Sequence, residues 1–278
     1  MSGFLFGTVG SPIATPAKPG GSVGAVQTIA ALGLTALELG WVQAVRVSEQ
    51  TCSLIKQEGE HLSVALSVHA PYFINLNADE TEWPKSRKRL MDAAHYGILA
   101  GATDIIFHPG SYFQKPPEEV LPVAIERLSG CVDELRKAHN PVTLRPETMG
   151  KSAMLGSLDD TLAMAKAIDQ VLPCIDFAHL HARPGDGSVN SANEWKEILE
   201  RYSNALGSDR LKHLHIHLSG IEYTSKGEKN HVPLRESDLK ITELFKTLKS
   251  AGAGGRIMCE SPIMEEDALY MKQLWDSL

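Results

Sequence analysis

The chain has 278 residues, of which 43% are hydrophobic and 22% charged. This apolar content suffices for a globular core and exceeds that of disordered chains. The net charge of −7 argues against a protein that coats nucleic acid with a generally basic surface. The sequence contains no apolar run near the ~20 residues of a membrane-spanning helix, and its N-terminus lacks the basic start of a secretory signal. Four dispersed cysteines without a CxxC pair are typical of free thiols in a cytoplasmic protein.

Short β-rich runs alternate with longer amphipathic stretches along the chain. Eight strands are predicted at residues 3–9, 35–41, 62–70, 103–108, 141–147, 173–179, 211–218 and 255–260. Between them, apolar residues recur at the three-to-four spacing of helices that pack on a sheet. Eight such units predict a TIM-type (β/α)8 barrel, an α/β fold that occupies residues 1–278 as a single domain. A doubly wound open sheet is the alternative, but it would need a Gly-rich phosphate-binding turn after an early strand.

Histidine and carboxylate residues collect at the ends of the predicted strands and in the loops that follow them. A barrel brings the C-terminal ends of its strands into one bowl, so we expect these side chains to converge. Imidazole and carboxylate groups are the ligands that Zn²⁺ or Mn²⁺ needs. The set exceeds the three or four ligands of one ion and predicts a metal cluster. Its members are His69, His108, Glu147, Asp176, His179, His217, His231 and Glu260.

The other histidines fit this bowl less well. His213 and His215 share a strand face with His217 by the two-residue period, but they lie lower. We therefore expect them in the interior or the bottom layer of the barrel. His181 is left undecided. Three more lie in predicted helices or loops, namely His61, His95 and His139.

The segments that carry the metal-ligand candidates resemble the endonuclease IV family, the TIM-barrel apurinic/apyrimidinic (AP) endonucleases on the xylose-isomerase-like barrel. The resemblance runs from the third strand to the eighth in the family's order. HPGS after an apolar strand and CIDxxH are its most specific parts. The matching segments include SVHAPYFINLN at 67–77, IIFHPGSY at 105–112, RPETMGKSAMLGSLDD at 145–160, CIDFAHLHA at 174–182, HLHIHLSG at 213–220 and MCESP at 258–262.

The resemblance implies a centre of two to three zinc ions. His69 and His108 correspond to ligands of the first zinc, and Glu147 corresponds to the carboxylate that bridges the first and second. The first strand departs from the family, because Thr8 or Val9 stands where the family has a histidine. The remaining ligands of the second zinc correspond to Asp176, His217 and Glu260.

The third zinc site also departs from the family. His179 and His231 correspond to two of its ligands, but Lys229 stands where an Asp-x-His motif has its aspartate. Glu228 is adjacent and could take the place of that aspartate. Because an ammonium group repels a cation, we expect Lys229 to face solvent or a DNA phosphate.

The activity implied by the resemblance is hydrolysis of a phosphodiester bond on the 5′ side of an abasic site in double-stranded DNA. Zinc lowers the pKa of bound water towards ~7, so that hydroxide forms at the metal near neutral pH. Glu147 would orient this nucleophile as well as bind two ions. Three divalent ions would add about +6 and nearly cancel the net charge of −7.

Contacts with DNA are predicted from the loops. Tyr72 and Phe73 follow His69, where the resembling family inserts side chains into the DNA stack, although a loop packing contact is an equal alternative. Trp41 and Arg46 are weaker candidates for such a wedge. The basic run at residues 85–89 is either a solvated helix face or a phosphate contact.

Two other functions are compatible with the sequence. A sugar isomerase or epimerase on a related barrel would use one divalent ion, held by Glu147, Asp176, His217 and Glu260. The surplus histidines argue against it. A non-catalytic protein that binds damaged DNA or nucleotides would be expected to lose metal ligands. We expect a monomer.

Overall fold

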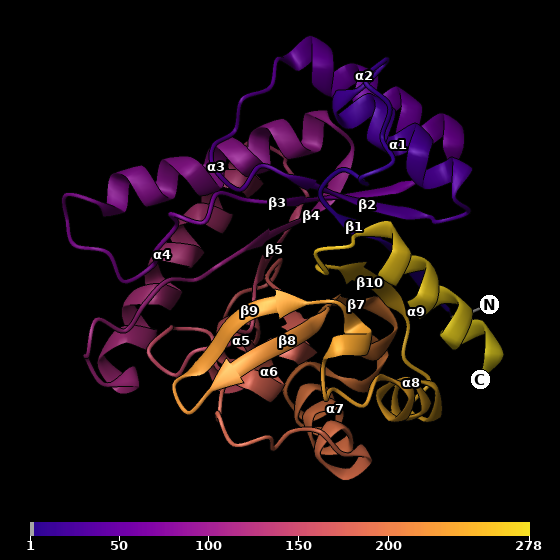
Figure 1. Cartoon of the computed structure of the whole chain (residues 1–278). Helices are drawn as coiled ribbons and strands as arrows, with labels where there is room; N and C mark the ends of the chain where they lie inside the picture. Colours follow the sequence, from indigo (N-terminus) through magenta and orange to yellow (C-terminus); the bar gives the residue numbers. More distant parts are fainter. Residues whose placement is uncertain (1–2) are drawn as a thin grey trace.

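Eight parallel strands form the centre of the computed structural model, which describes residues 3–278 (Figure 1). Each strand lies beside the next barrel strand along the chain, and the last lies beside the first. The predicted TIM barrel is confirmed. The barrel strands are β1 (Phe4–Val9), β2 (Ala36–Gly40), β3 (Ala65–His69), β4 (Ala102–Phe107), β5 (Thr143–Pro146), β6 (Cys174–Asp176), β7 (Leu214–Leu218) and β10 (Gly255–Cys259).

The barrel closes between β5 and β6 through a few contacts rather than a continuous ladder. Leu144 bridges Val171, and Glu147 bridges Cys174, both in the parallel sense. The backbone N–H of Thr148 donates to the carbonyl of Cys174 at 3.0 Å. Since β6 has only three residues, this closure leaves the ends of β5 and β6 close together at the mouth of the barrel.

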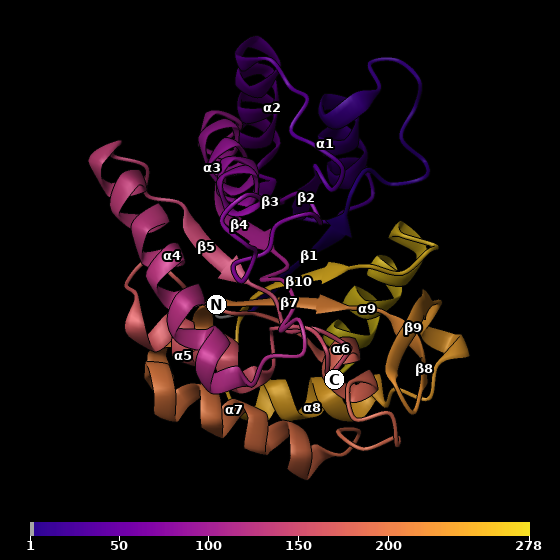
Figure 2. The ribbon, with the colours of Figure 1, turned by 90° about the vertical axis from the view of Figure 1, so that its left-hand side faces the viewer.

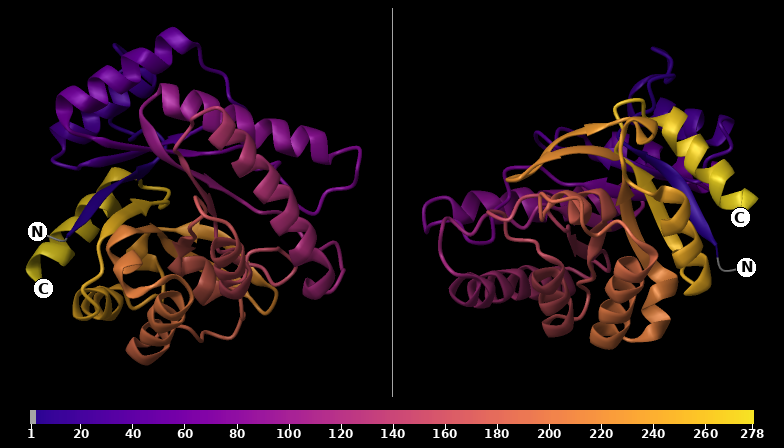
Figure 3. Two further views of the ribbon diagram at one scale, coloured as in Figure 1. Left: turned by 180° about the vertical axis from the view of Figure 1, so that it is seen from behind. Right: turned by 60° about the horizontal axis from the view of Figure 1, so that its bottom comes forward.

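Helices surround the strands on their outer side (Figures 2 and 3). α1 and α9 flank β1, where Phe4 meets Trp275 edge to face at 5.1 Å. Within residues 3–278, no helix is long and apolar enough to cross a membrane. The helices are α1 (Gly21–Ala31), α2 (Glu49–Leu62), α3 (Trp83–Leu99), α4 (Pro117–Lys137), α5 (Leu158–Ala167), α6 (Phe177–Ala182), α7 (Ala192–Leu206), α8 (Ile241–Ser250) and α9 (Glu265–Ser277), with 3-10 turns η1 (Ser208–His213) and η2 (Leu234–Glu236).

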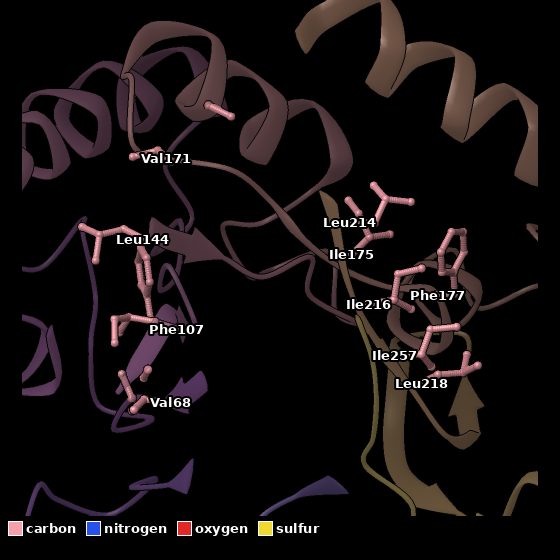
Figure 4. Close-up of a cluster of buried hydrophobic side chains, with 14 of the residues drawn as sticks. Val68, Phe107, Leu144, Val171, Ile175, Phe177, Leu214, Ile216, Leu218 and Ile257 are labelled. Carbon is pink, nitrogen blue, oxygen red and sulfur yellow. The ribbon is translucent and has the colours of Figure 1, made fainter. Parts of the chain in front are cut away.

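The seventh strand shows how the alternating pattern separates the core from the barrel interior. Leu214, Ile216 and Leu218 point outward and pack under the helices, in the apolar cluster drawn in Figure 4. His215 and His217 alternate with them and are buried inside the barrel. The side chains that face inward are therefore polar, although a barrel interior is usually filled with apolar residues.

Three details differ from the prediction. The sixth strand ends at Asp176, and residues 177–182 form α6, because the Asp176 side chain accepts from the His179 backbone N–H and caps that helix. The long loop after β7 contains an antiparallel hairpin of β8 (Gly220–Thr224) and β9 (Gly227–Val232). His213 belongs to η1 and is exposed, so of the two lower histidines only His215 lies in the interior.

Candidate metal centre

The candidate ligands meet at the C-terminal ends of the barrel strands, and Glu147 lies at their centre. Its Oε2 is 3.4 Å from Nε2 of His69 and 3.5 Å from Nε2 of His108. Its Oε1 is 3.5 Å from Nδ1 of His217 and 3.2 Å from Nδ1 of His179. The two oxygens of one carboxylate therefore face two different groups of imidazoles, which is the geometry of a bridging ligand.

Two groups of donor atoms share Glu147. One consists of His69, His108 and Glu147, and in it all ligand atoms lie within 4.8 Å of one another. The same limit holds for a second group, which consists of Glu147, Asp176, His217 and Glu260. Three or four donors of these types are the usual ligand set of one Zn²⁺ ion.

Several buried polar atoms at this centre have no hydrogen-bond partner. They are both carboxylate oxygens of Glu147, Nε2 of His69, Oδ2 of Asp176 and Nδ1 of His217. Unpaired polar groups cost about 1–3 kcal/mol each when buried. Nδ1 of His69 donates to the Ala70 carbonyl at 2.9 Å, so its Nε2 carries a lone pair. Lone pairs and carboxylate oxygens that converge in this way fit metal cations.

A third group of donors lies beside the first two, where α6 meets the β8–β9 hairpin. Nε2 of His179 is 3.2 Å from Nε2 of His231 and 3.6 Å from a carboxylate oxygen of Glu228. Nδ1 of His179 faces the Thr148 carbonyl at 2.9 Å, whereas Nδ1 of His231 lies 3.0 Å from the Ser219 hydroxyl and 3.3 Å from the Glu260 carbonyl. Because Nδ1 of His179 donates to the Thr148 carbonyl, the neutral ring of His179 presents its Nε2 lone pair to Nε2 of His231. A cation between them would relieve this contact.

The titration of the buried acids follows from their neighbours. Burial raises the pKa of Glu147, but the nearby imidazoles of His217, His108 and His179 lower it by more, to well below its usual value. Burial raises the pKa of Asp176 to about 6, and His179 offsets only part of this effect. Burial lowers the pKa of His179, but Asp176 and Glu147 raise it well above its usual value. Such coupled shifts are typical of functional sites.

Glu38, on β2, is a member of this centre that we did not predict. It is fully buried, and its carboxylate accepts from Ser67 Oγ at 2.8 Å, from His215 Nε2 at 2.8 Å and from His217 Nε2 at 3.0 Å. Burial raises the pKa of Glu38, but His217 and His215 lower it by more, to well below its usual value. A lone acid in the middle of an apolar strand was the available signal, because such a residue must be paired when buried.

A cavity of about 430 Å³ opens above the centre. Its polar lining consists of candidate ligands together with Tyr72, and Val9, Met149 and Met264 form an apolar wall. Of the two first-strand residues Thr8 and Val9, Val9 therefore faces the cavity. The Thr8 hydroxyl donates to the Gly10 carbonyl at 2.8 Å instead.

The two aromatic residues after His69 have different surroundings. The Tyr72 ring stacks on His108 with centroids 5.0 Å apart, so it covers a candidate ligand. Phe73 is 56% exposed, and its backbone carbonyl accepts from Arg89 at 2.9 Å. Phe73 is therefore an apolar side chain held outward, whereas Tyr72 is also part of the cavity wall.

The basic residues are paired with acids on their own surface. Lys229 lies 2.9 Å from Glu222 on the exposed side of the hairpin, as the expectation that it faces solvent requires. In the basic run, Lys85 and Arg89 pair with Glu82. The other two pairs are Lys88 with Asp92 and Arg87 with Glu134. The run is thus a solvated helix face on which four cations share three carboxylates.

Other predicted positions lie outside the centre. Trp41 is 9% exposed, and its backbone N–H donates to the His69 carbonyl, so the interpretation of Trp41 as a DNA wedge is wrong. His181 is buried below the hairpin and contacts Asp238 at 3.0 Å. His61, His95 and His139 lie in or beside helices of the outer layer, as expected.

Comparisons with known proteins match most of the chain. A family model described as a xylose isomerase-like TIM barrel matches residues 26–275. An uncharacterized protein of Methanocaldococcus jannaschii is 37% identical over 275 residues, which cover 99% of this chain and 97% of that protein. Endonuclease 4 of Thermus thermophilus is 29% identical over 205 residues, which cover 70% of this chain and 71% of that protein.

Solved structures with the same fold include two kinds of enzyme. Endonuclease IV from Thermus thermophilus superposes with a TM-score of 0.71 at 20% identity, over 98% of both chains. A D-tagatose 3-epimerase-like protein also superposes with a TM-score of 0.71, at 19% identity, over 92% of this chain and 94% of the other. At these identities, the superpositions establish the fold alone.

Proposed function

Because the chain belongs to the xylose isomerase-like TIM-barrel family, we propose that it is a DNA repair phosphodiesterase, which cleaves DNA on the 5′ side of abasic sites with the help of bound metal ions. The observation that carries this proposal is the surplus of donor groups around Glu147. His69 and His108 approach one of its oxygens, and His217 approaches the other. These donors exceed what a single ion needs.

We propose that the ions are Zn²⁺, two to three per chain, with Mn²⁺ as the alternative. Two of the donor groups share Glu147, and a third contains His179, His231 and Glu260, with Glu228 nearby. When bound, such ions lower the pKa of a coordinated water and neutralise the charge that develops on a phosphodiester. Three of them would contribute about +6 against a net charge of −7.

In this proposal the chain's own residues hold the ions and position the reacting groups. Glu147 acts as the catalytic residue, because its two oxygens face both ligand groups and can orient an attacking water between them. Asp176 and Glu260 complete the second group. The sequence offers no nucleophile motif of the Ser-His-Asp or Cys-His kind, in agreement with direct attack by water.

The cavity favours a phosphodiester over a free sugar. Apart from Tyr72, its polar lining is made of the candidate ligands themselves, and Val9, Met149 and Met264 offer no hydrogen bonds from their side chains to sugar hydroxyls. Phe73, which follows Tyr72 and is exposed, is suited to insertion into a DNA stack. Lys229 is exposed on the hairpin and would contact a phosphate there.

A sugar epimerase that uses one metal ion is the second candidate. Glu147, Asp176, His217 and Glu260 form a group that could hold a single ion. The epimerase-like structure and the endonuclease IV structure match this chain with the same TM-score of 0.71, so the fold does not separate the two functions. The two functions differ in whether the remaining histidines bind further metal ions.

The test is cleavage of a labelled duplex that contains one abasic site by the zinc-loaded chain. We expect one cut on the 5′ side of that site, no cut in an undamaged duplex, and no cut after a chelator has removed the metal. Elemental analysis of the same sample should give two to three ions per chain. An intact abasic duplex, one ion per chain and conversion of a ketohexose into its 3-epimer would support the sugar epimerase instead.

We further propose that residues 1–278 act as a single domain and as a monomer. The four cysteines are buried free thiols, which supports a reducing, cytoplasmic location. Sedimentation analysis of the purified chain, alone and with duplex DNA, would test the proposed monomer. A stable dimer in the absence of DNA would contradict it.

A further inference from the structure

Glu38 reaches across the barrel interior from β2 to β7, two strands that are separated by β1 and β10. We propose that Glu38 is a positioning residue that fixes the ring orientation and the tautomer of His217, so that His217 binds a metal ion through Nδ1. This inference rests on the metal centre of the proposed function but is independent of the DNA substrate.

The hydrogen bond between Glu38 and His217 determines which nitrogen is free. Oε1 of Glu38 lies 3.0 Å from Nε2 of His217, and it acts as an acceptor because Ser67 and His215 already donate to the other oxygen of the same carboxylate. Nε2 therefore carries the hydrogen, and the lone pair of the neutral ring lies on Nδ1. That atom faces Oε1 of Glu147 at 3.5 Å and Oε1 of Glu260 at 3.4 Å, and it has no hydrogen-bond partner. Nδ1 is thus the nitrogen presented to an ion.

Two further donors hold the Glu38 carboxylate in place. The Ser67 hydroxyl and Nε2 of His215 both donate to its Oε2, each at 2.8 Å. Glu38, Ser67 and His215 are all almost completely buried, so water does not compete for these hydrogen bonds. With Oε2 fixed by two donors, the direction of Oε1 towards His217 is also fixed. Partners of this kind orient metal ligands and raise their basicity.

A different arrangement would make Glu38 a ligand itself. Donor atoms of Glu38, His69 and His217 also lie within 4.8 Å of one another, as a metal site requires. In that arrangement His217 would bind through Nε2, the nitrogen nearest to Glu38. The three hydrogen bonds already made by Glu38 favour the positioning role. The two arrangements differ in the nitrogen that carries the ion, and this difference can be measured.

The first experiment is a long-range ¹H–¹⁵N spectrum of the zinc-loaded chain labelled with ¹⁵N-histidine. The His217 signals are assigned by their loss in His217→Gln. We expect a protonated Nε2 and a zinc-bound Nδ1 for His217. Zinc on Nε2 would overturn the inference, and this result needs no change at Glu38 and therefore no assumption about whether a variant folds.

The second experiment compares Glu38→Gln with Ser67→Ala. A glutamine amide can donate to Nε2 of His217 and so move its hydrogen to Nδ1. We expect zinc affinity, measured by competition with a chelator, to fall about 10–100-fold in Glu38→Gln. Ser67→Ala removes one hydrogen bond to Glu38 but leaves the contact with His217, so it should keep the wild-type tautomer. Equal zinc affinities of wild type and a folded Glu38→Gln would overturn the inference.

The outcome for Glu38 is distinguishable from that of the proposed function. A chain that binds zinc through Nδ1 of His217 but does not cut abasic DNA would support the positioning role and contradict the endonuclease. A chain that cuts abasic DNA and binds zinc through Nε2 of His217 would support the endonuclease and overturn the positioning role.

Discussion

The two ends of the barrel interior both contain buried charged residues, but they balance these charges in opposite ways. At the N-terminal end, Asp104 pairs with Arg145 and lies 3.4 Å from Arg256. Arg145 also donates to the carbonyls of Pro173 and His213, at 3.0 and 3.2 Å. Every charge in this group thus finds its partner within the chain.

At the C-terminal end, carboxylates and imidazole lone pairs face one another, and no Lys or Arg side chain within residues 3–278 forms an ion pair with them. The unpaired atoms of Glu147, Asp176 and His217 lie at this end, whereas Asp104 has donors at both oxygens. A buried cluster whose charges are all paired within the chain stabilises the fold. A buried cluster with unpaired donor atoms can instead bind ions from solution.

The pKa values of two buried aspartates express the same contrast. Burial raises the pKa of Asp104, but Arg145 and Arg256 lower it by more, to far below the usual range. Burial raises the pKa of Asp176 to about 6, and Glu260 and Glu147 raise it further against the opposing effect of His179. The same chemical group is thus stabilised as an anion at one end and destabilised as an anion at the other.

The largest effect is expected at the C-terminal end, for Glu147→Gln. This change weakens two donor groups at once, so cleavage of abasic DNA should fall about 10³-fold, against about 10²-fold for His69→Ala. The metal-free variant should also unfold at lower temperature than the wild type, because the neighbouring imidazoles stabilise the Glu147 anion in the folded chain and lower its pKa. Initial rates and thermal unfolding after chelation measure both effects. Equal losses of activity in the two variants would count against a bridging role for Glu147.

At the N-terminal end, the corresponding change should affect stability alone. Asp104→Asn leaves Arg145 buried without its carboxylate and should lower the free energy of unfolding by about 3–5 kcal/mol. Asp92→Asn is the matched control, because it breaks an exposed pair with Lys88 and should cost less than about 1 kcal/mol. Zinc content per folded chain should stay unchanged in both. Loss of zinc in folded Asp104→Asn would break the distinction between the two ends.

The sequence predicted the C-terminal end of the barrel better than the interior beneath it. His69, His108 and Glu147 stand at or directly after the ends of apolar strands, and strand ends of a barrel meet whatever the details of the packing. Glu38 and Asp104 lie within strands, where the role of an acidic side chain depends on which partners contact it across the barrel. Those partners are far away in sequence, so no local pattern identified them.

The β8–β9 hairpin also could not be predicted from the local sequence pattern. Its strands are short and half exposed, and they alternate too weakly to be told from a polar loop. The hairpin nevertheless determines which residues form the third group of donors, because β9 contains Glu228, Lys229 and His231. Its register turns Glu228 towards His179 and Lys229 away from it, which sequence spacing alone could not show.

The two ends should also respond differently to pH. With a pKa of about 6, Asp176 is protonated below that pH and cannot then bind a cation. Zinc affinity should therefore fall as the pH decreases from about 8 to about 5, because His179, whose pKa is raised well above its usual value, and then Asp176 take up protons that compete with the ion. Asp104 has a lowered pKa, so its stabilising effect is present above its unfolded-state value of ~3.9 and is lost as the pH falls further. Titrations with a fluorescent zinc chelator from about pH 8 to about pH 5, at buffered ionic strength, test the first point. Constant affinity over that range would contradict it.

Tyr72 and Phe73, in the loop after β3 at the C-terminal end, should contribute to DNA binding without affecting the buried charges of the metal centre. Replacing Tyr72 and Phe73 together by alanine should weaken binding to an abasic duplex about tenfold or more, because stacked side chains contribute about 1–3 kcal/mol each. Metal content and thermal stability should be retained. Leu54→Ala, an equally exposed apolar position on α2, serves as the control in the same binding assay. Unchanged affinity of the double variant would assign both residues to loop packing.

The smallest effect is expected at two neighbouring residues of β9 whose side chains point in different directions. Glu228 points towards Nε2 of His179 at 3.6 Å, whereas Lys229 pairs with Glu222 on the exposed face. Glu228→Gln should therefore weaken the ion held by His179 and His231 several-fold, so that stepwise chelation releases one ion earlier than in the wild type. Lys229→Asp should tighten the same ion only slightly, because the ammonium group that it removes already faces solvent and its charge is screened. A larger effect of Lys229→Asp than of Glu228→Gln would show that the hairpin turns in solution. The third ion would then depend on the position where the resembling family carries its aspartate.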